Sequence, residues 1–349
     1  MRILQVRRLG RVEYEDGLAA QALLVKARTA GLVPDTILLL EHPPVITLGR
    51  GAKAGNVLWS RARLEEQGFQ IFETDRGGDV TYHGPGQIVG YPILDLKPDR
   101  KDVRKYVGSV EELMIRVAAD YGIDAGRVQG RTGVWTGPGK LGAIGVHLSR
   151  WITSHGFAFN VSTQLADFQA IVPCGISDAG VVSLESLLGK APPLAEVEER
   201  FMHHAGRLWE TDPEEVVTEL QTISVAITRR GKLLLLQRTP ERGGFWQLLT
   251  GRIERGESPL QAAAREVHEE TGYSPRLEEL RDLDYRHSFA LGESSFAHET
   301  AYALAAPDHD PRLSAEHQAF KFCTLEEALA LLPFAGLKRA AKSALQRQL

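Results

Sequence analysis

Hydrophobic residues in the first part of the chain fall into short runs separated by glycine-rich turns. Residues 33–40 and 88–96 are two such runs, and their length and bounding turn residues predict β-strands. In residues 107–121 and 194–209 the apolar positions instead recur at helical spacing, which predicts helices. The pattern indicates a domain that mixes strands and helices.

The hydrophobic pattern breaks after residue 188 and restarts near residue 222, which marks a domain boundary. Residues 189–193 combine glycine and two prolines and are typical of a loop. The acidic stretch 211–215 is expected to cap one more helical turn, and a strand hairpin is expected at 223–236. We therefore expect a first domain at 1–212, a linker at 213–221 and a second domain at 222–349.

Length, charge and cysteine content restrict the class of protein. A chain of 349 residues is long enough for two domains, each with a core. A formal net charge of −4 does not suit a basic nucleic-acid-binding protein. Two cysteines are too few for a disulfide framework, and no apolar run approaches the roughly 18 residues of a membrane span. The N-terminal residues are charged where a signal peptide requires an apolar core, so a cytoplasmic protein is expected.

The most specific local pattern lies in residues 251–273 and predicts a helix with an acidic face. Ser258 is suited to the N-cap, and Gly272 to the left-handed residue that ends a helix. Three carboxylates share one side of this helix at i, i+3, i+4 spacing: Glu266, Glu269 and Glu270. Carboxylates at that spacing repel one another unless a cation lies among them, and oxygen ligands suit Mg²⁺. A solvated acidic helix face is the alternative.

The whole string resembles the Nudix hydrolase motif, Gly-x5-Glu-x7-Arg-Glu-U-x-Glu-Glu-x-Gly-U, in which U is apolar. Each fixed position is filled here, with Val267 and Tyr273 at the two apolar positions. The resemblance covers roughly residues 220–345. It implies an α/β/α sandwich, in which helices surround a mixed sheet, and Mg²⁺-assisted hydrolysis of a nucleoside diphosphate linked to another moiety.

The same resemblance implies roles for individual residues. The metal ligands would be one carbonyl and three carboxylates: Gly251, Glu266, Glu269 and Glu270. Glu269 is also assigned to catalysis, and Arg265 would orient the acidic cluster through an ion pair. Segments 245–247 and 316–318 resemble the branch that acts on nucleoside or pterin triphosphates. Glu316 is open to two interpretations, a catalytic base or a surface glutamate.

Two residues of the first domain have the chemistry of a nucleophile and its activator. Cys174 lies between a proline and a glycine, which suits a turn that presents a side chain to a pocket. A thiol with the ordinary pKa of about 8.5 is mostly protonated at neutral pH and needs a cation nearby. Lys140 is a candidate, because small and apolar residues follow it. The alternatives are a buried structural cysteine and a solvated lysine.

Residues 76–87 form a third segment of interest, rich in glycine and proline. The Lys-Ser/Thr ending of a phosphate-binding loop is missing, and a structural hairpin turn is the alternative. Together with residues 47–50, 140–145, 155–160 and 173–176, this segment resembles the lipoyl(octanoyl) transferases, which attach octanoate to lipoyl domains. The five motifs occur in order along the first domain.

This second resemblance implies the α+β fold shared with lipoate and biotin ligases. It assigns Cys174 as the acyl-thioester nucleophile and Lys140 as the group that lowers the pKa of that thiol. The acyl chain and its carbonyl would be held by three segments: Arg76, Gly77, Gly78, Asp79, Val80, Thr81, Tyr82, His83; Ala143, Ile144, Gly145; and Gly156, Phe157, Ala158. For His83, contact with the acyl carbonyl and a structural role are both open.

The implied reaction is a double displacement. The thiolate of Cys174 would take an octanoyl group from octanoyl-acyl carrier protein. The lysine of a lipoyl domain, in a 2-oxoacid dehydrogenase or the glycine cleavage H protein, would then accept it as an amide. The transferase would need no cofactor, because the thioester is already activated. Lys140, if neutral after acylation, would accept the proton of the attacking amine.

Two alternatives remain at this point. One is an ATP-dependent lipoate-protein ligase on the same fold, against which Cys174 argues, since an acyl-adenylate route needs no thiol. The other is a binding or regulatory protein in which one half is degenerate. The presence of Cys174, Lys140 and the carboxylate triplet favours a bifunctional enzyme, an octanoyltransferase joined to a Nudix hydrolase.

Overall fold

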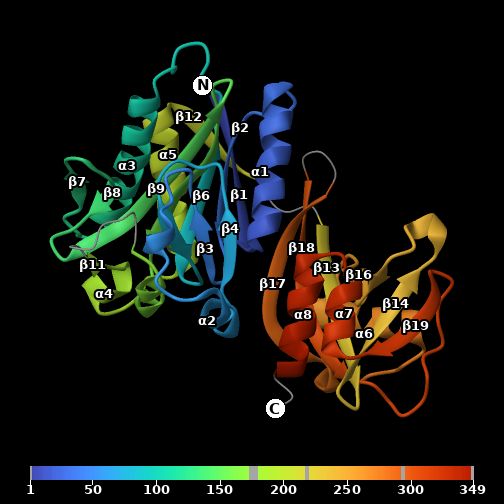
Figure 1. The fold of residues 1–349 in the computed structure, drawn as a ribbon. Coiled ribbons are helices and arrows are strands. Elements are labelled where there is room, and N and C mark those ends of the chain that lie inside the picture. Colours follow the sequence, from blue (N-terminus) through green and yellow to red (C-terminus); the bar gives the residue numbers. More distant parts are fainter. Residues whose placement is uncertain (1, 173–179, 217–219, 292–294, 347–349) are drawn as a thin grey trace. The chain divides into compact units, whose positions relative to one another are not determined.

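The structure is a computed structural model that describes residues 2–172, 180–216, 220–291 and 295–346. These residues fall into two compact units, the first ending at residue 216 and the second beginning at residue 220. Figure 1 shows both, coloured along the sequence. Each unit has its own sheet and its own hydrophobic core.

A mixed sheet of nine described strands forms the centre of the first unit. Its strands follow the order β12 (Thr211–Glu215), β1 (Arg2–Arg11), β2 (Asp35–Glu41), β6 (Gln87–Ile93), β10 (Ile152–Asn160), β9 (Gly139–Ser149), β8 (Arg131–Trp135) and β7 (Gly126–Val128), with β11 (Gly180–Val181) beside β9. Strand β1 is parallel to both its neighbours, and the pairings from β2 to β7 are antiparallel. The sequence prediction of strands at β2 and β6 is confirmed.

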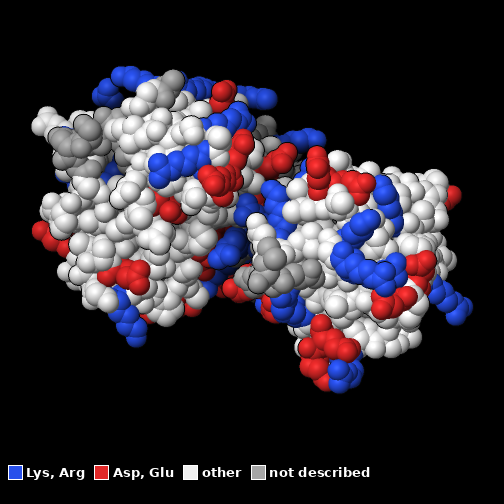
Figure 2. Space-filling view, turned by 60° about the horizontal axis from the view of Figure 1, so that its bottom comes forward, with Lys and Arg blue, Asp and Glu red and all other residues white. Residues whose placement is uncertain are grey.

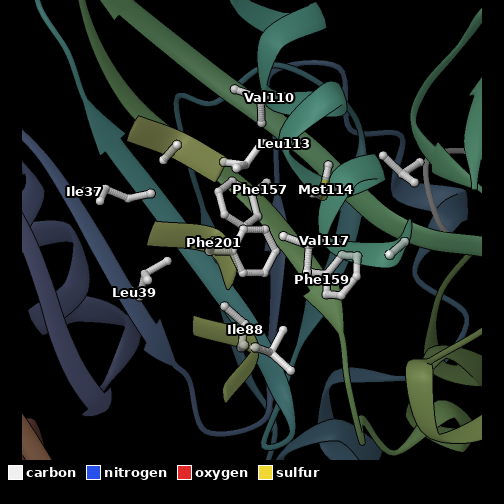
Figure 3. Packing of buried hydrophobic residues seen from close by; sticks show 14 of the residues in the cluster. Ile37, Leu39, Ile88, Val110, Leu113, Met114, Val117, Phe157, Phe159 and Phe201 are labelled. Carbon is white, nitrogen blue, oxygen red and sulfur yellow. The ribbon is translucent and has the colours of Figure 1, made fainter. Parts of the chain in front are cut away.

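Two helices, α3 (Val103–Asp120) and α5 (Leu194–Trp209), cover one face of this sheet (Figure 1). Their apolar sides pack on the rings of Phe157 and Phe159 from β10 (Figure 3). Phe201 of α5 lies between those rings, 4.9 Å from one centroid and 5.3 Å from the other. Both helices confirm the prediction from apolar spacing. Short helix α4 (Leu184–Leu188) precedes α5.

The other face of the sheet carries α1 (Tyr14–Thr29) and a small three-stranded sheet. That sheet has the order β4 (Gln70–Glu73), β3 (Val45–Leu48), β5 (Val80–His83), and helix α2 (Arg61–Glu66) lies between β3 and β4 in the chain. Behind it is a second core cluster that includes Ile46, Leu64 and Tyr82. Among the described residues, the 3-10 turns of the first unit are η1 Ala54–Asn56 and η2 Leu165–Ala170, and those of the second unit are η4 Pro240–Arg242 and η5 Leu277–Glu279.

The acidic stretch after α5 is a strand, and the prediction of a helical turn there is wrong. Residues Thr211–Glu215 pair in parallel with β1, from Arg2 opposite Thr211 to Val6 opposite Glu215. The threonine, aspartate and proline resemble a helix start, but pairing with β1 overrides that local preference. Pro213 is tolerated because β12 is at the edge of the sheet. The segment 211–215 therefore belongs to the sheet of the first unit.

The second unit is a sheet between two helical layers. Its strands follow the order β15 (Trp246–Gln247), β14 (Lys232–Arg238), β13 (Leu220–Arg229), β18 (Ser295–Ala305), β17 (Arg281–Leu291), with β16 (Leu249–Arg252) beside β13 and β19 (His317–Cys323) beside β14. Helix α6 (Pro259–Thr271) packs on one face, and α7 (Leu325–Leu331) and α8 (Ala335–Gln346) pack on the other. The predicted hairpin is confirmed as β13 and β14.

Helix α6 has the termini that its sequence predicts. The hydroxyl of Ser258 accepts a hydrogen bond from the Gln261 amide, and the Gln261 side chain accepts one from the Ser258 amide. Gly272 ends the helix at φ 70°, in the left-handed region. Cys323 is fully buried in the core of the second unit, and burial raises the pKa of its thiol.

Charged side chains of both signs are interspersed over the surface seen in Figure 2. No wide field of one sign covers either unit there, in agreement with the small net charge. Among the helices that the structure describes, none is long and apolar enough to cross a membrane.

Candidate active sites

A pocket opens on the face of the first unit's sheet that is opposite α3 and α5. Its space measures about 450 Å³, open solvent included. The predicted substrate-binding residues that line it are Arg76, Gly78, Asp79, Thr81, His83, Ala143, Ile144, Gly145, Gly156, Phe157 and Ala158. Most of its wall is apolar, and three segments far apart in sequence meet there.

Three residues of the predicted set do not line this pocket. Val80 and Tyr82 are fully buried in the cluster behind the small sheet, where the Tyr82 hydroxyl donates a hydrogen bond to Asp167 at 2.6 Å. Side chains alternate along a strand, so Thr81 and His83 face the pocket while their neighbours face the core. Gly77 donates its backbone N–H to the carbonyl of Val146. The candidate site therefore contains only part of the run 76–83.

Arg76 fixes the loop that leads into the pocket wall. It is 6% exposed, and its guanidinium donates hydrogen bonds to the hydroxyl and the carbonyl of Thr47 at 2.8 and 2.7 Å. Gly49 and Gly145 leave room for it, since a Cβ would lie 2.7 Å from its Nη1 at the first and 2.9 Å from its Cδ at the second. This packing explains why motif 47–50 accompanies motif 76–87 in the sequence.

Lys140 lies in a second, smaller cavity that adjoins the first. Three residues line both cavities: Thr81, Ala143 and Ala158. Lys140 is 6% exposed, and its Nζ lies 5.2 Å from the ring centre of Trp135. Gly133 provides space for it, because a Cβ there would lie 2.8 Å from the Lys140 Cε. The lysine is therefore a buried cation at the end of the apolar pocket.

Cys174 lies outside the described residues, but both sides of its segment are described. Before it, the backbone N–H of Val172 donates to the carbonyl of Asn56 at 2.8 Å. After it, Val181 pairs with Lys140 in the register of β11 and β9, and Val182 donates its N–H to the Lys140 carbonyl. Phe168 and Val181 both line the Lys140 cavity. The two flanks of the segment thus border the same cavity.

Several aromatic and histidine residues that the sequence analysis did not select also form the site. Tyr14, Tyr91 and His155 line the larger pocket. His42 lies behind them, with its Nδ1 donating to the Val12 carbonyl and its Nε2 2.7 Å from the Tyr91 hydroxyl. Burial lowers the pKa of His42 to about 4. Tyr14, His42 and Tyr91 lie outside the five motifs, which is why no sequence signal selects them.

His155 is held at the pocket wall by Asp75. Its Nε2 lies 2.8 Å from the Asp75 carboxylate, and its backbone N–H donates to Gln21. Burial lowers the pKa of His155, although the bond to Asp75 opposes that effect. Asp75 and Gln21 thus fix the position of His155 in the pocket wall.

In the second unit, the predicted carboxylates surround one arginine. Arg265 donates to Glu257, to Glu266 at 2.9 Å and to Glu269 at 3.1 Å. Glu270 is 5% exposed, and its Oε2 has no hydrogen-bond partner in the described part of the chain. Burial, with a smaller effect of Glu266, raises the pKa of Glu270 to about 8. The arginine thus neutralises part of this acidic face, but its hydrogen bonds to carboxylates go to Glu257, Glu266 and Glu269 and do not reach Glu270.

The backbone of Gly251 approaches the same cluster. A Cβ at Gly251 would lie 2.1 Å from the Glu266 Cδ, so only glycine permits this closeness. Within residues 2–172, 180–216, 220–291 and 295–346, no three acidic, histidine or cysteine side chains already stand in an arrangement that could hold a metal ion. Glu316 forms an ion pair with Arg242 at 2.8 Å, and its side chain is 39% exposed.

Comparison with known proteins identifies the class of each unit. Residues 13–206 match the lipoyl protein ligase A/B catalytic domain, and residues 219–345 match the NUDIX domain. A crystal structure of lipoate-protein ligase A bound with ATP shares the fold of the first unit, with TM-score 0.50 and 14% identity over 61% of this chain and 90% of that chain. The chain therefore combines a lipoate-protein-ligase-like fold with a Nudix fold.

Its relatives narrow this class. An octanoyltransferase of Myxococcus xanthus is 52% identical over 99% of both chains, and one of Acidobacterium capsulatum is 49% identical over 64% of this chain and 99% of its own length. The chain belongs to the octanoyltransferase family and carries a Nudix hydrolase domain as its second unit. It is an enzyme with transferase and hydrolase activity.

A methyl group at Gly133 is expected to disturb the transferase through Lys140. In Gly133→Ala the new Cβ would lie 2.5 Å from the Gly142 carbonyl oxygen and 2.8 Å from the Lys140 Cε, so both must move, and a displacement of Lys140 by about 1 Å costs roughly tenfold to a hundredfold in rate. Gly130→Ala is the matched control, because Gly130 also has positive φ but has nothing within 4 Å of its Cβ position. Octanoyl transfer rates of both variants test this. Equal rates in the two would contradict a positioning effect on Lys140.

His42 is expected to make the first unit less stable in mild acid. The unfolded histidine takes up a proton near its ordinary pKa of 6.5, but the folded one does so only near pH 4. The stability from neutral His42 is therefore present above pH 6.5 and lost as pH falls towards 4, by up to about 1.4 kcal/mol per pH unit. Calorimetry of wild type and His42→Asn at values from about pH 7 to about pH 5, which covers the upper part of that window, measures the difference in the free energy of unfolding. Parallel pH dependence in both proteins would exclude it.

Proposed function

We propose that this enzyme transfers an octanoyl group from octanoyl-acyl carrier protein to a lysine of lipoyl domains, through a thioester on Cys174. One observation carries the proposal: an apolar pocket continues into a cavity that holds a buried ammonium. Thr81, Ala143 and Ala158 line both spaces, and Lys140 lines the second. An acyl chain fits the apolar part, and its reacting carbonyl then lies towards Lys140.

The position of Cys174 in the chain supports its role as nucleophile. It follows Val172 by two residues, which an extended chain spans in about 7 Å at most. Phe168 and Val181, on either side of its segment, border the Lys140 cavity. A thiol within reach of an ammonium has a lowered pKa, and the thiolate is the nucleophilic form.

The first half-reaction transfers the acyl group to the enzyme. The Cys174 thiolate attacks the thioester carbon of the acyl carrier protein, the new C–S bond forms and the carrier's C–S bond breaks. The leaving thiolate takes a proton from the Lys140 ammonium. An octanoyl-Cys174 thioester and a neutral Lys140 remain.

The second half-reaction uses that neutral amine. The lysine of a lipoyl domain, as its free amine, attacks the octanoyl carbonyl carbon, a C–N bond forms and the C–S bond to Cys174 breaks. Lys140 accepts the proton released from the attacking nitrogen. The thiolate and ammonium pair is restored, and ATP has no part in the cycle.

Mixing the protein with octanoyl-acyl carrier protein, without ATP, is expected to add the mass of one octanoyl group. Cys174→Ala abolishes the adduct, because the nucleophile is lost, and Lys140→Ala slows its formation. Cys323→Ala is the matched control, since Cys323 is a buried core thiol of the second unit. Intact-protein mass spectrometry measures all four proteins.

The same experiment distinguishes the ligase alternative. A ligase would transfer octanoate only with free octanoic acid and ATP, and Cys174→Ala would keep that activity. Full activity of Cys174→Ala with either donor would overturn the thioester route.

For the second unit, we propose Mg²⁺-assisted hydrolysis of a nucleoside diphosphate linked to another moiety, or of a nucleoside triphosphate. The residues that would hold the ion are one carbonyl and three carboxylates: Gly251, Glu266, Glu269 and Glu270. Their chemistry fits, because all supply oxygen and the buried Oε2 of Glu270 has no partner among the described residues. Bound Mg²⁺ supplies positive charge that polarises a diphosphate and lowers the pKa of water.

The other residues of this site orient these ligands. Arg265 joins Glu266 and Glu269 to Glu257 and to the Arg252 carbonyl, which aligns α6 with the strand that carries Gly251. Glu269 has a side chain that is 54% exposed, so solvent reaches its carboxylate, and we assign it the catalytic role.

Mg²⁺ is expected to stabilise the second unit. A ligand at a hundred times its Kd adds about 2.7 kcal/mol to the free energy of unfolding, and removal of one ligand charge in Glu270→Gln should abolish most of this gain. Glu326→Gln, on the exposed side of α7, is the control. Calorimetry with and without Mg²⁺ measures the gain, and phosphate or pyrophosphate release from a panel of nucleotides identifies the substrate. Equal gains in both variants would exclude Glu270 as a ligand.

A further inference from the structure

A chain of hydrogen bonds fixes which nitrogen of His83 carries its proton. Asn160 donates through Nδ2 to the Val182 carbonyl at 3.0 Å, so its Oδ1 is free to accept. Gln87 donates through Nε2 to that oxygen at 2.9 Å and lies 3.3 Å from the Tyr82 carbonyl. The amide nitrogen of Gln87 is thus committed to two acceptors, and its Oε1 lies 2.7 Å from the Nδ1 of His83. Because that oxygen only accepts, Nδ1 must carry the hydrogen.

The other nitrogen of His83 is therefore a lone-pair acceptor. Burial lowers the pKa of His83, which keeps the ring neutral at physiological pH. His83 is 7% exposed and lines the acyl pocket, and no hydrogen-bond partner of its Nε2 lies among the described residues. A neutral ring with Nδ1–H has no hydrogen to give at Nε2. Contact with the acyl carbonyl, which also only accepts, is thus excluded as a hydrogen bond for this tautomer.

The geometry points to a hydrogen bond in which the amino group of the incoming lysine donates to His83 Nε2. Gln87 and Asn160 are positioning residues that set the tautomer of His83. This inference rests on the proposed double displacement. The octanoyl chain has no polar hydrogen, and a thioester has only acceptor atoms. The attacking amine is the reacting group that brings N–H bonds to this pocket.

His83 lies next to the place where that amine must arrive. Thr81 and His83 are two residues apart on β5 and face the same side, and Thr81 lines both the acyl pocket and the Lys140 cavity. Gln87, which holds His83, also lines the Lys140 cavity. A hydrogen bond from the amine to Nε2 at this junction leaves the nitrogen lone pair free to face the thioester carbon.

The division of labour between His83 and Lys140 follows from their basicity. His83 orients the amine without removing its proton, because a buried neutral imidazole of lowered pKa is a weak base. The C–N bond forms, the C–S bond to Cys174 breaks, and the proton goes to Lys140. His83 therefore acts mainly in the second half-reaction, because no amine takes part in the first.

The tautomer is tested directly by NMR of ¹⁵N-histidine-labelled full-length protein. We expect the Nδ1–H form at His83 in wild type and in Gln87→Glu, whose carboxylate still accepts from Nδ1. In Gln87→Leu the acceptor is lost, and the Nε2–H form should appear. An Nε2–H form in wild type would overturn the inference.

The role is tested by two variants that each retain one half of the imidazole. His83→Asn places an amide at the position of Nδ1 and keeps a donor for Gln87, whereas His83→Gln places an amide oxygen near the position of Nε2. Because His83 lines the pocket, both half-reactions are measured in each variant, and in His83→Asn we expect adduct formation to slow less than transfer from the adduct. Transfer from the adduct to a lipoyl domain should slow roughly tenfold in His83→Asn, the effect of one lost hydrogen bond, and much less in His83→Gln.

Each outcome separates this inference from the function on which it rests. If wild type forms no octanoyl adduct, the double displacement fails and the inference fails with it. If the adduct forms but both half-reactions slow equally, or the two variants behave alike, only the role of His83 is overturned. Thermal unfolding of each variant identifies those that fold like wild type.

Discussion

The buried ammonium of Lys140 is the constraint around which the first unit is organised. Removing a charged group from water is costly unless the protein supplies compensating contacts, so its surroundings must be built for it. Gly133 has no side chain that would occupy the space of the lysine, and the Trp135 ring lies beside the Nζ. Gly133 and Trp135 thus leave room for the Lys140 side chain, whereas strand β11 pairs only with its backbone.

Strand alternation then lets one sheet serve stability and chemistry at once. On β10, Phe159 packs under α3 and α5, whereas Ala158 and Asn160 on either side of it face the cavities, and Phe157 contacts both the core and the pocket. On β5 the same rule separates the core residue Tyr82 from the site residues Thr81 and His83. A shift of one residue in either strand would exchange core and site, so the core packing also fixes the register of the site.

The sequence predictions that the structure confirms depend on residues close together in the chain. The caps of α6 are set by neighbouring residues, and the helical spacing of α5 by its own apolar positions, so both can be predicted without the rest of the fold. The prediction of a helical turn at β12 was wrong because the segment pairs with β1, about two hundred residues away in the chain. Nothing in Thr211–Glu215 itself indicates that contact. Tyr14, which lines the pocket, and His42, which packs against Tyr14, were missed for the same reason, since only tertiary packing brings them there.

Each of the two sites buries an ionisable side chain, a lysine in the first unit and a glutamate in the second. In the first unit Lys140 is buried in a cavity that Phe168 and Val181 also line, and under the proposed reaction its ammonium would favour the thiolate form of Cys174. In the second, three carboxylates of α6 share one arginine, and burial together with mutual repulsion raises the pKa of Glu270. A divalent cation relieves that repulsion and a carboxylate-bound arginine alone does not, because Glu270 lies outside its hydrogen bonds. Glu270 is therefore a buried carboxylate that neither solvent nor Arg265 stabilises in the described structure, and the metal site proposed for α6 would account for its position.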